Sequence, residues 1–173
     1  WVYMNGADGE SRGLFDSINW NTSNFRIIAS GNNELTVQIA SDGAVTSYTS
    51  EMTNMTKGKW IHCVVHVPKA TSSAGSLYIN GEKSNYTTST AMEVASRDIN
   101  IGYGGGLNQA YLNGVITEVS VWNTTLSLAN VQELYNDGKG LNAKEHSKYI
   151  GNNSLLTGYW RNNGLSQWND LAG

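Results

Sequence analysis

The chain has 173 residues, the size of one domain, and a chain of this length removes about 70% of its unfolded surface from water when it folds. Only 14% of its residues are charged and the net charge is −3, so no basic surface is expected to attract nucleic acid or an anionic membrane. No apolar run approaches the roughly 20 residues that span a bilayer. We therefore expect no nucleic-acid partner and no membrane insertion.

Short segments of alternating apolar and polar residues, separated by turn dipeptides, recur along the chain. The first clear example places Leu35, Val37 and Ile39 on one face, and Asp42-Gly43 follows as a two-residue hairpin turn because both positions tolerate positive φ. This pattern predicts antiparallel strands.

Three later segments follow the same pattern. Residues 59–67 and 115–122 each predict one strand with an apolar face, and Asn80-Gly81 predicts the turn of a hairpin between them. So many short strands in one core indicate two packed sheets, because a single open sheet would leave a face and two edges exposed.

One segment has helical spacing instead. Ser127 is a suitable N-cap, apolar residues recur every three or four positions after it, and Gly138 is placed to end the helix in the left-handed conformation. The fold class expected is all-β: a two-sheet antiparallel jelly-roll sandwich with one short capping helix near 127–137.

The order of four segments carries a family resemblance. These are KGKWIHCVVHV, SLYINGEKS, INIGYGGG and YLNGVITEVSVWNTTLSLANVQELYNDG. Taken together they resemble the second half of a laminin-G-like, concanavalin A-like jelly roll of the pentraxin kind. Residues 1–57 fit the first half more loosely, and the resemblance implies a first strand upstream of Trp1.

From about Gly140 the chain carries a small charge cluster and no clean period, which is typical of a linker or arm. We expect a jelly-roll domain over residues 1–140, and a linker or arm with the start of a further unit at 141–173. The tail GYWRNNGLSQWNDLAG is similar to the segment that opens a further laminin-G-like unit in bacterial surface proteins and marine phage structural proteins. We expect a fragment of a longer, multidomain extracellular, cell-surface or virion protein.

The tail also predicts a contact. A jelly roll without its first strand leaves a sheet edge or a core face uncovered, and the apolar segment LLTGYW could occupy that place. We expect Leu155, Leu156, Tyr159 and Trp160 to pack on this domain or on a neighbouring copy.

The sequence argues against an enzyme. A retaining glycoside hydrolase needs two carboxyl groups about 5 to 5.5 Å apart. The Glu-x-Asp-x-Glu strand of laminarinase-type relatives is absent, and Glu118 stands alone on its strand.

His62 and Cys63 are adjacent, so they point to opposite faces of one strand and cannot act as base and nucleophile. His62 and His66 lie about 13 Å apart along that strand, too far to share a zinc ion.

The resemblance assigns structural roles to the same region. It places Trp60 and Trp122 in core positions and implies that His62 packs beside Trp60.

Calcium is the cofactor that the resemblance raises. The pentraxin-type calcium loop corresponds to residues 102–114, which contain no carboxylate and would bind a hard cation weakly. A different rim site would have to use Asp8, Glu10 or Asp16.

The remaining candidates suit a sugar. Carbohydrate sites stack a pyranose face on an exposed aromatic ring and bind its hydroxyls with amides and carboxylates. Two loops of the chain offer such side chains, and the candidates are Trp20, Asn21, Tyr103, Asn108, Gln109 and Tyr111.

Two functions therefore remain open. The first is a non-catalytic carbohydrate-recognition domain that binds a glycan or polysaccharide. The second is an architectural module that contacts neighbouring copies or subunits through sheet edges or the 140–173 arm. A glycoside hydrolase is a third and weaker alternative. Exposed and clustered Tyr103, Tyr111 or Trp20 would favour the first function.

Overall fold

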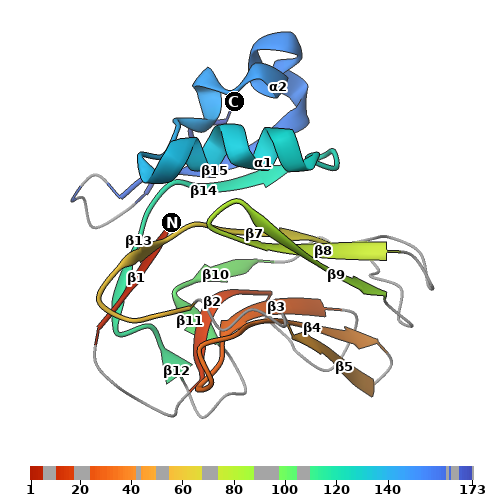
Figure 1. Cartoon of the computed structure of the whole chain (residues 1–173), viewed down its shortest axis with the longest axis vertical. Helices are drawn as coiled ribbons and strands as arrows, with labels where there is room; N and C mark the ends of the chain where they lie inside the picture. Colours follow the sequence, from red (N-terminus) through yellow and green to blue (C-terminus); the bar gives the residue numbers. More distant parts are fainter. Residues whose placement is uncertain are drawn as a thin grey trace.

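The computed structural model describes residues 1–5, 11–17, 24–41, 44–49, 55–67, 74–87, 98–104, 110–162, 164 and 168–172. Figure 1 shows two stacked layers of strands, with the helices on the outer side of the upper layer. The expected all-β sandwich is confirmed.

The lower layer is a five-stranded antiparallel sheet in the order β10-β2-β3-β4-β5. Its strands are β2 (Arg12–Ser17), β3 (Asn24–Ala29), β4 (Leu35–Ser41), β5 (Ala44–Thr49) and β10 (Ile99–Ile101). Leu35, Val37 and Ile39 of β4 are fully buried, as their alternation predicts. The predicted turn at Asp42-Gly43 lies outside the described residues.

The upper layer contains two three-stranded groups, ordered β13-β1-β6 and β7-β8-β9. The strands are β1 (Val2–Met4), β6 (Trp60–Ile61), β7 (Cys63–His66), β8 (Ala74–Ile79), β9 (Glu82–Thr87) and β13 (Gly114–Ile116). Asn80 and Gly81 both have positive φ, 52° and 79°, which confirms the two-residue turn between β8 and β9.

Two segments predicted as single strands are divided. The chain from 59 to 67 becomes β6, which pairs with β1, and β7, which pairs with β8. The chain from 115 to 122 becomes β13 and β14 (Val119–Trp122), and Glu118 between them has a φ of 54°. A left-handed residue interrupts the extended backbone, so the two halves take different partners.

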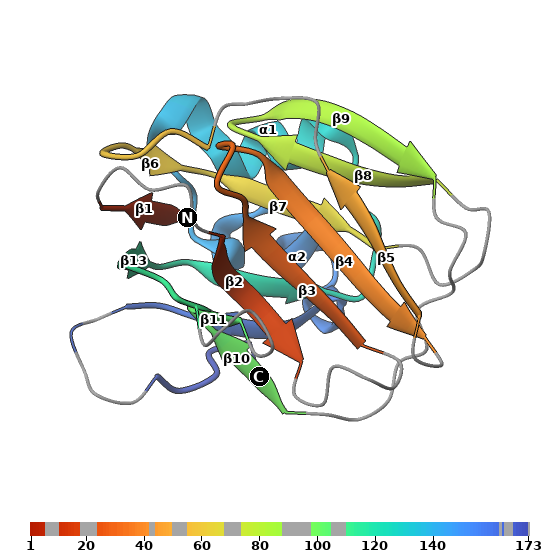
Figure 2. The ribbon, with the colours of Figure 1, turned by 90° about the horizontal axis from the view of Figure 1, so that it is seen from below.

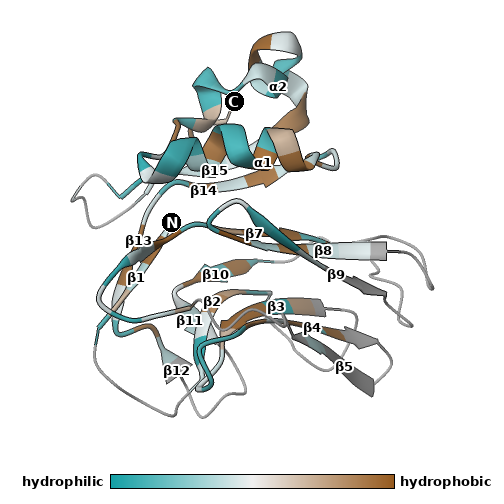
Figure 3. Cartoon of the chain, in the orientation of Figure 1, coloured by the Kyte–Doolittle hydropathy of each residue, from teal (hydrophilic) through white to brown (hydrophobic). Residues whose placement is uncertain are grey.

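The main core lies between the two layers. Its buried members include Val2, Met4, Ile61 and Leu77 from the upper layer and Leu35 from the lower layer, all 3% exposed or less. Figure 3 shows apolar stretches, in brown, on strands of both layers. Trp60 alternates with Ile61, so it faces outward and is 46% exposed. Its expected core position is therefore wrong.

The helix predicted at 127–137 is α1 (Leu128–Tyr135). The Ser127 hydroxyl accepts from the Asn130 N–H at 3.3 Å, and the Asn130 side chain accepts from the Ser127 N–H at 3.2 Å, which completes a capping box. The left-handed C-cap is Asn136, two residues before the predicted Gly138, because a 3-10 turn over Asn136–Gly138 follows.

The segment after α1 folds back onto β14. It contains short helical turns at Ala143–Glu145 and Asn153–Leu155, helix α2 (Ser147–Gly151) and strand β15 (Leu156–Trp160). β15 pairs antiparallel with β14, and Leu156 and Tyr159 are buried at 4% and 1% exposure. The expected packing of these two residues on this domain is confirmed.

β15 does not occupy the place of the first strand, which the sequence suggests for the segment LLTGYW. Figure 1 shows β15 on the side of β14 that faces away from β7. α1 and the segment after it lie outside β14, so the returning chain meets that outer edge. The inner edge of β14 stays uncovered by this tail.

The described helices include none that is long and apolar enough to cross a membrane.

Candidate functional site

A small hairpin presents two tyrosine rings side by side. β11 (Tyr103–Gly104) pairs with β12 (Ala110–Tyr111), and the register places Tyr103 opposite Tyr111. Their ring centroids are 4.8 Å apart at an interplanar angle of 39°. Tyr111 is 65% exposed and Tyr103 is partly exposed. We call this pair the tyrosine platform.

The platform is attached to the lower sheet through backbone contacts. A β-carbon on Gly13 of β2 would lie 2.2 Å from the Gly104 nitrogen, so only glycine allows the hairpin to lie so close. The Gly102 N–H donates to the Leu14 carbonyl at 3.0 Å, and the Leu112 N–H donates to the Gly102 carbonyl at 2.9 Å. The β11 end of the hairpin is therefore bonded to β2, and the β12 end is bonded to the β11 end.

The structure places only part of the predicted sugar site. Tyr103 and Tyr111 lie together, whereas Asn108 and Gln109 belong to residues 105–109, outside the described part of the chain. Trp20 and Asn21 also lie outside it. The cross-strand pairing of the two tyrosines was not predicted, and the sequence signal for it is a glycine-rich segment flanked by residues of high strand propensity.

The predicted calcium ligands lie in different settings. Asp16 is 2% exposed on β2, opposite Arg26 of β3. Burial lowers the pKa of Arg26, and the nearby charge of Asp16 opposes this shift. Asp16 therefore lies within the lower sheet. Asp8 and Glu10 lie outside the described residues, and the described residues include no cluster of three or more His, Cys, Asp or Glu side chains that could hold a metal ion. The calcium site stays a prediction.

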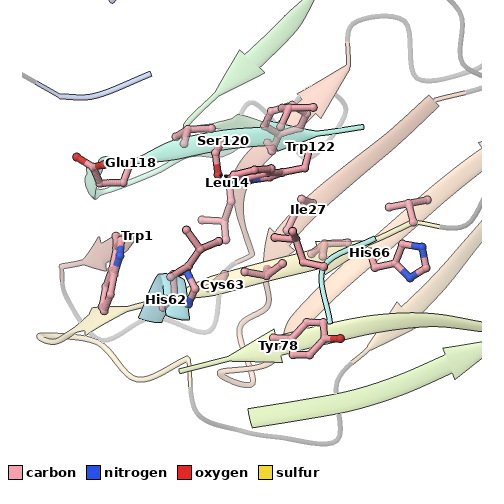
Figure 4. Close-up of a pocket in the computed structure, with 18 of the residues that line it drawn as sticks. Trp1, Leu14, Ile27, His62, Cys63, His66, Tyr78, Glu118, Ser120 and Trp122 are labelled. Carbon is pink, nitrogen blue, oxygen red and sulfur yellow. Dashed lines mark hydrogen bonds between the residues drawn. The ribbon is translucent and has the colours of Figure 1, made fainter. Parts of the chain in front are cut away.

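A second feature is a cavity of about 310 Å³ between β7 and β14, which we call the slot. Figure 4 shows β14 on one side with Ser120 and Trp122, β7 on the other side with Cys63 and His66, and Trp1 at one end. Figure 2, seen from below, shows the strands of the lower sheet lying across the upper layer.

The walls of the slot are mostly apolar. From the lower sheet they include Leu14, Phe25 and Ile27, and from the α1 side they include Leu126 and Leu134. A cavity of this size is at the lower end of the range for small-ligand pockets. Sequence reasoning did not locate the slot, although the apolar alternation of both flanking segments and the strand expected upstream of Trp1 were the available signals.

His62 and Cys63 lie in the slot wall and are poor candidates for catalysis. Burial lowers the pKa of His62 to about 3, with a further contribution from the terminal ammonium group. Burial raises the pKa of Cys63 to about 12, so the thiol stays protonated at neutral pH. The Cys63 Sγ lies 3.5 Å from the Met55 Sδ, among core residues.

The imidazole of His62 has a packing role. Its ring lies 5.1 Å from the ring of Trp1 and 5.9 Å from that of Tyr135, and it is 6% exposed. A structural role is thus supported, but the neighbours are Trp1 and Tyr135 and not the expected Trp60.

Glu118 joins β14 to the tail. Its carboxylate accepts hydrogen bonds from the Tyr159 hydroxyl and, at 2.6 Å, from the Arg161 Nε. The pKa of Tyr159 is raised by burial and by the bond to Glu118, and the carboxylate raises the pKa of Arg161. Both partners of Glu118 lie more than 40 residues away in the chain, so the sequence alone does not identify them.

Comparison with known proteins defines the class. The laminin-G-type family model described as "Concanavalin A-like lectin/glucanases superfamily" matches residues 1–132, most of the chain. The chain belongs to this superfamily, as the resemblance implied. A search of curated proteins finds no match.

Two solved structures are similar to this chain. The native heptameric SAP-like pentraxin from Limulus polyphemus matches with a TM-score of 0.57 and 13% identity, over 82% of this chain and 69% of the pentraxin chain. The S-layer domain-containing protein (residues 221–444) from Clostridium thermocellum matches with a TM-score of 0.41 and 22% identity, over 78% of this chain and 66% of that one. The pentraxin supports the fold alone.

Proposed function

We propose that this chain is a non-catalytic carbohydrate-recognition domain of a larger extracellular, cell-surface or virion protein. The observation that carries the proposal is the tyrosine platform: two adjacent rings, one of them 65% exposed, anchored on a sheet. A pyranose ring offers an apolar face that stacks on such a surface. Membership of a superfamily that includes lectins agrees with this chemistry.

The proposed site also includes four of the residues that the sequence singled out. Asn108 and Gln109 lie in the segment that joins β11 and β12, and Trp20 and Asn21 belong to a second loop. Amide side chains donate and accept hydrogen bonds, as the hydroxyls of a neutral sugar require. We propose these residues as the polar part of the site.

The settings of Asp16 and Glu118 support a binding role more than hydrolysis. Asp16 is buried opposite Arg26, and Glu118 is bonded to Tyr159 and Arg161. Both acids are thus engaged in structural contacts. A retaining hydrolase needs two acids free to flank one glycosidic bond.

The binding test is a glycan array followed by isothermal titration with the oligosaccharides that bind. Tyr111→Ala is expected to weaken binding by about two- to tenfold, since aromatic stacking is worth about 0.5 to 1.5 kcal/mol. Tyr111→Phe keeps the ring and should retain most of the affinity.

Trp60→Ala is the matched control, because Trp60 is an exposed ring that lies against Tyr3, with ring centroids 5.6 Å apart, outside the platform. If Trp60→Ala abolishes binding and Tyr111→Ala does not, the sugar site lies on β1 and β6 and our assignment is wrong. If no glycan binds even at millimolar concentration, the carbohydrate function itself fails.

Calcium is a separate proposal for the rim of the domain. Because Asp16 faces Arg26 inside the sheet, the proposal now depends on Asp8 and Glu10. Calorimetric titration with calcium should give heat that vanishes on Asp8→Ala plus Glu10→Ala, and a flat titration of the unchanged chain would refute it.

An architectural module is the second candidate function. It is favoured by the way β15 adds to the outer edge of β14, since such an arm can pack on sheet edges of neighbouring units. An empty glycan array together with concentration-dependent self-association would favour this function over carbohydrate binding.

A further inference from the structure

Both strands that border the slot have one edge without a ladder partner in the described part of the chain. β7 pairs with β8 on one side, and β14 pairs with β15 on its outer side. Their inner edges face each other across the slot (Figure 4). Edges inside a sandwich are normally paired, because unpaired backbone groups away from water are costly.

The backbone of β7 directs hydrogen-bonding groups into the slot. The His62 carbonyl accepts from the Asn80 N–H at 2.9 Å, so His62 directs its backbone groups toward the β8 side. Backbone groups alternate in direction along a strand. The N–H and carbonyl groups of Cys63 and Val65 therefore face the slot.

The N-terminal end of β1 points into the slot, so an extension of β1 would run between the inner edges of β7 and β14. β1 runs antiparallel to both neighbours, with Val2 opposite Ile61 on one side and opposite Ile116 on the other. Trp1 extends this pattern: its nitrogen donates to the Thr117 carbonyl at 2.9 Å, and its carbonyl accepts from the Thr117 N–H at 3.0 Å. The backbone nitrogen of Trp1 thus already sits between the two strands.

The register between β1 and β6 determines which residues of β7 would lie opposite a strand upstream of Trp1. In the pairing with β6 and β7, the first residue upstream of Trp1 would lie opposite Cys63, the second opposite Val64 and the third opposite Val65. Cys63 and Val65 face the core between the layers, whereas Val64 faces α1. Both faces of such a strand would therefore be covered.

The side chains around the slot show incomplete burial. Phe25 and Ile27 of the lower sheet and Val65 of β7 point toward the core but stay only partly buried, and Val121 of β14 is 37% exposed. The Nδ1 atom of His62 is buried and has no hydrogen-bond partner among the described residues. Each of these groups would gain a neighbour from a strand in the slot.

We propose that the slot is the docking site for an extended polypeptide segment that continues β1 upstream of Trp1 and pairs with β7 and β14 at once. Counted upstream from Trp1, the first, third and fifth residues of this segment would face the core and would be apolar. Burial lowers the pKa of the Trp1 ammonium group, so a peptide bond at this nitrogen would also remove a poorly solvated charge.

The test is an extension of the full chain. A Val-Thr-Val-Thr-Val segment fused directly before Trp1 places valines opposite Cys63, Val65 and Val67. We expect it to raise Tm by about 5 °C or more. It should also slow hydrogen exchange at the Cys63 and Val65 amides and reduce binding of the apolar dye 8-anilinonaphthalene sulfonate.

A Ser-Gly-Ser-Gly-Ser extension of equal length is the control, and it should leave Tm, exchange and dye binding near those of the unextended chain. If the two extensions behave alike, the slot does not accept a strand and the proposal is wrong. If light scattering shows that the unextended chain is a dimer that already protects the Cys63 and Val65 amides, a second copy fills the slot and the assignment to β1 is overturned.

Discussion

The tyrosine platform and the slot are two places where apolar side chains are incompletely buried, but they differ in what surrounds them. The platform lies on a hairpin that is hydrogen-bonded to β2 through Gly102, and the Tyr111 ring is 65% exposed. The slot lies within the upper layer, where two strand edges and part of the core are uncovered. An exposed ring on a complete framework suits a soluble ligand, whereas an open strand edge above a core suits a polypeptide backbone.

The first way to sharpen this comparison is a pair of identical substitutions in the core. Val37 is fully buried in β4, and Val65 lies partly buried beside the slot. Val37→Ala should lower the free energy of unfolding by about 2 to 3 kcal/mol, and Val65→Ala by about 1 kcal/mol or less, because Val65 has less contact to lose. Urea denaturation of both variants measures the difference. Equal losses would mean that the slot is filled in solution.

The second prediction concerns pH, because His62 lies in the slot wall. Its pKa is about 3 in the folded chain and has its ordinary value of about 6.5 when unfolded, so between these values the unfolded state binds the extra proton. The contribution of His62 to stability should therefore be nearly constant above about pH 7 and fall by roughly 1 kcal/mol per pH unit as the pH drops toward 4.

His62→Phe keeps a ring against Trp1 and Tyr135 and removes the titrating group. Unfolding curves collected from pH 7 to pH 4 should have a shallower slope for this variant. An unchanged slope would show that His62 is already accessible to protons in the folded chain.

The third prediction concerns the edge of β14 that faces away from the slot. Tyr159→Phe removes the hydroxyl that donates to Glu118, and should cost about 1 to 2 kcal/mol, because the carboxylate loses a partner. Tyr149→Phe in α2 is the matched control and should cost less than 0.5 kcal/mol. Thermal unfolding compares the two. Equal, small losses would show that the bond to Glu118 contributes nothing to the closure of this edge.

The smallest expected effect on stability belongs to the platform. Tyr111→Ala should change the free energy of unfolding by less than about 0.5 kcal/mol, since the ring is 65% exposed. A loss above 1 kcal/mol would show that the ring supports the fold, and would weaken its assignment to ligand binding.

The elements that depend on local chemistry could be predicted from the sequence. The alternation at Leu35, Val37 and Ile39, the turn at Asn80-Gly81 and the Ser127 cap each depend on a few neighbouring residues, and the structure contains all three. The capping helix and the all-β class follow from the same kind of signal.

Long-range pairing could not be read in this way. Glu118 interrupts a segment that has the period of one strand, with a left-handed φ, and its carboxylate bonds to residues far along the chain. The outward position of Trp60 follows from which strand lies beside it, and periodicity alone does not say which face of a strand becomes the core. The slot, for the same reason, became visible only with the sheet order.

The most direct test of the account is a nuclear magnetic resonance titration of the isotope-labelled chain with neutral oligosaccharides that bind in the array. We predict that chemical-shift changes concentrate at Tyr103, Tyr111 and the segment between them, while the amides of Cys63, Val65 and Val121 stay unchanged. Changes centred on β7 and β14, or no changes at all at saturating sugar, would contradict the assignment of the platform as the ligand surface.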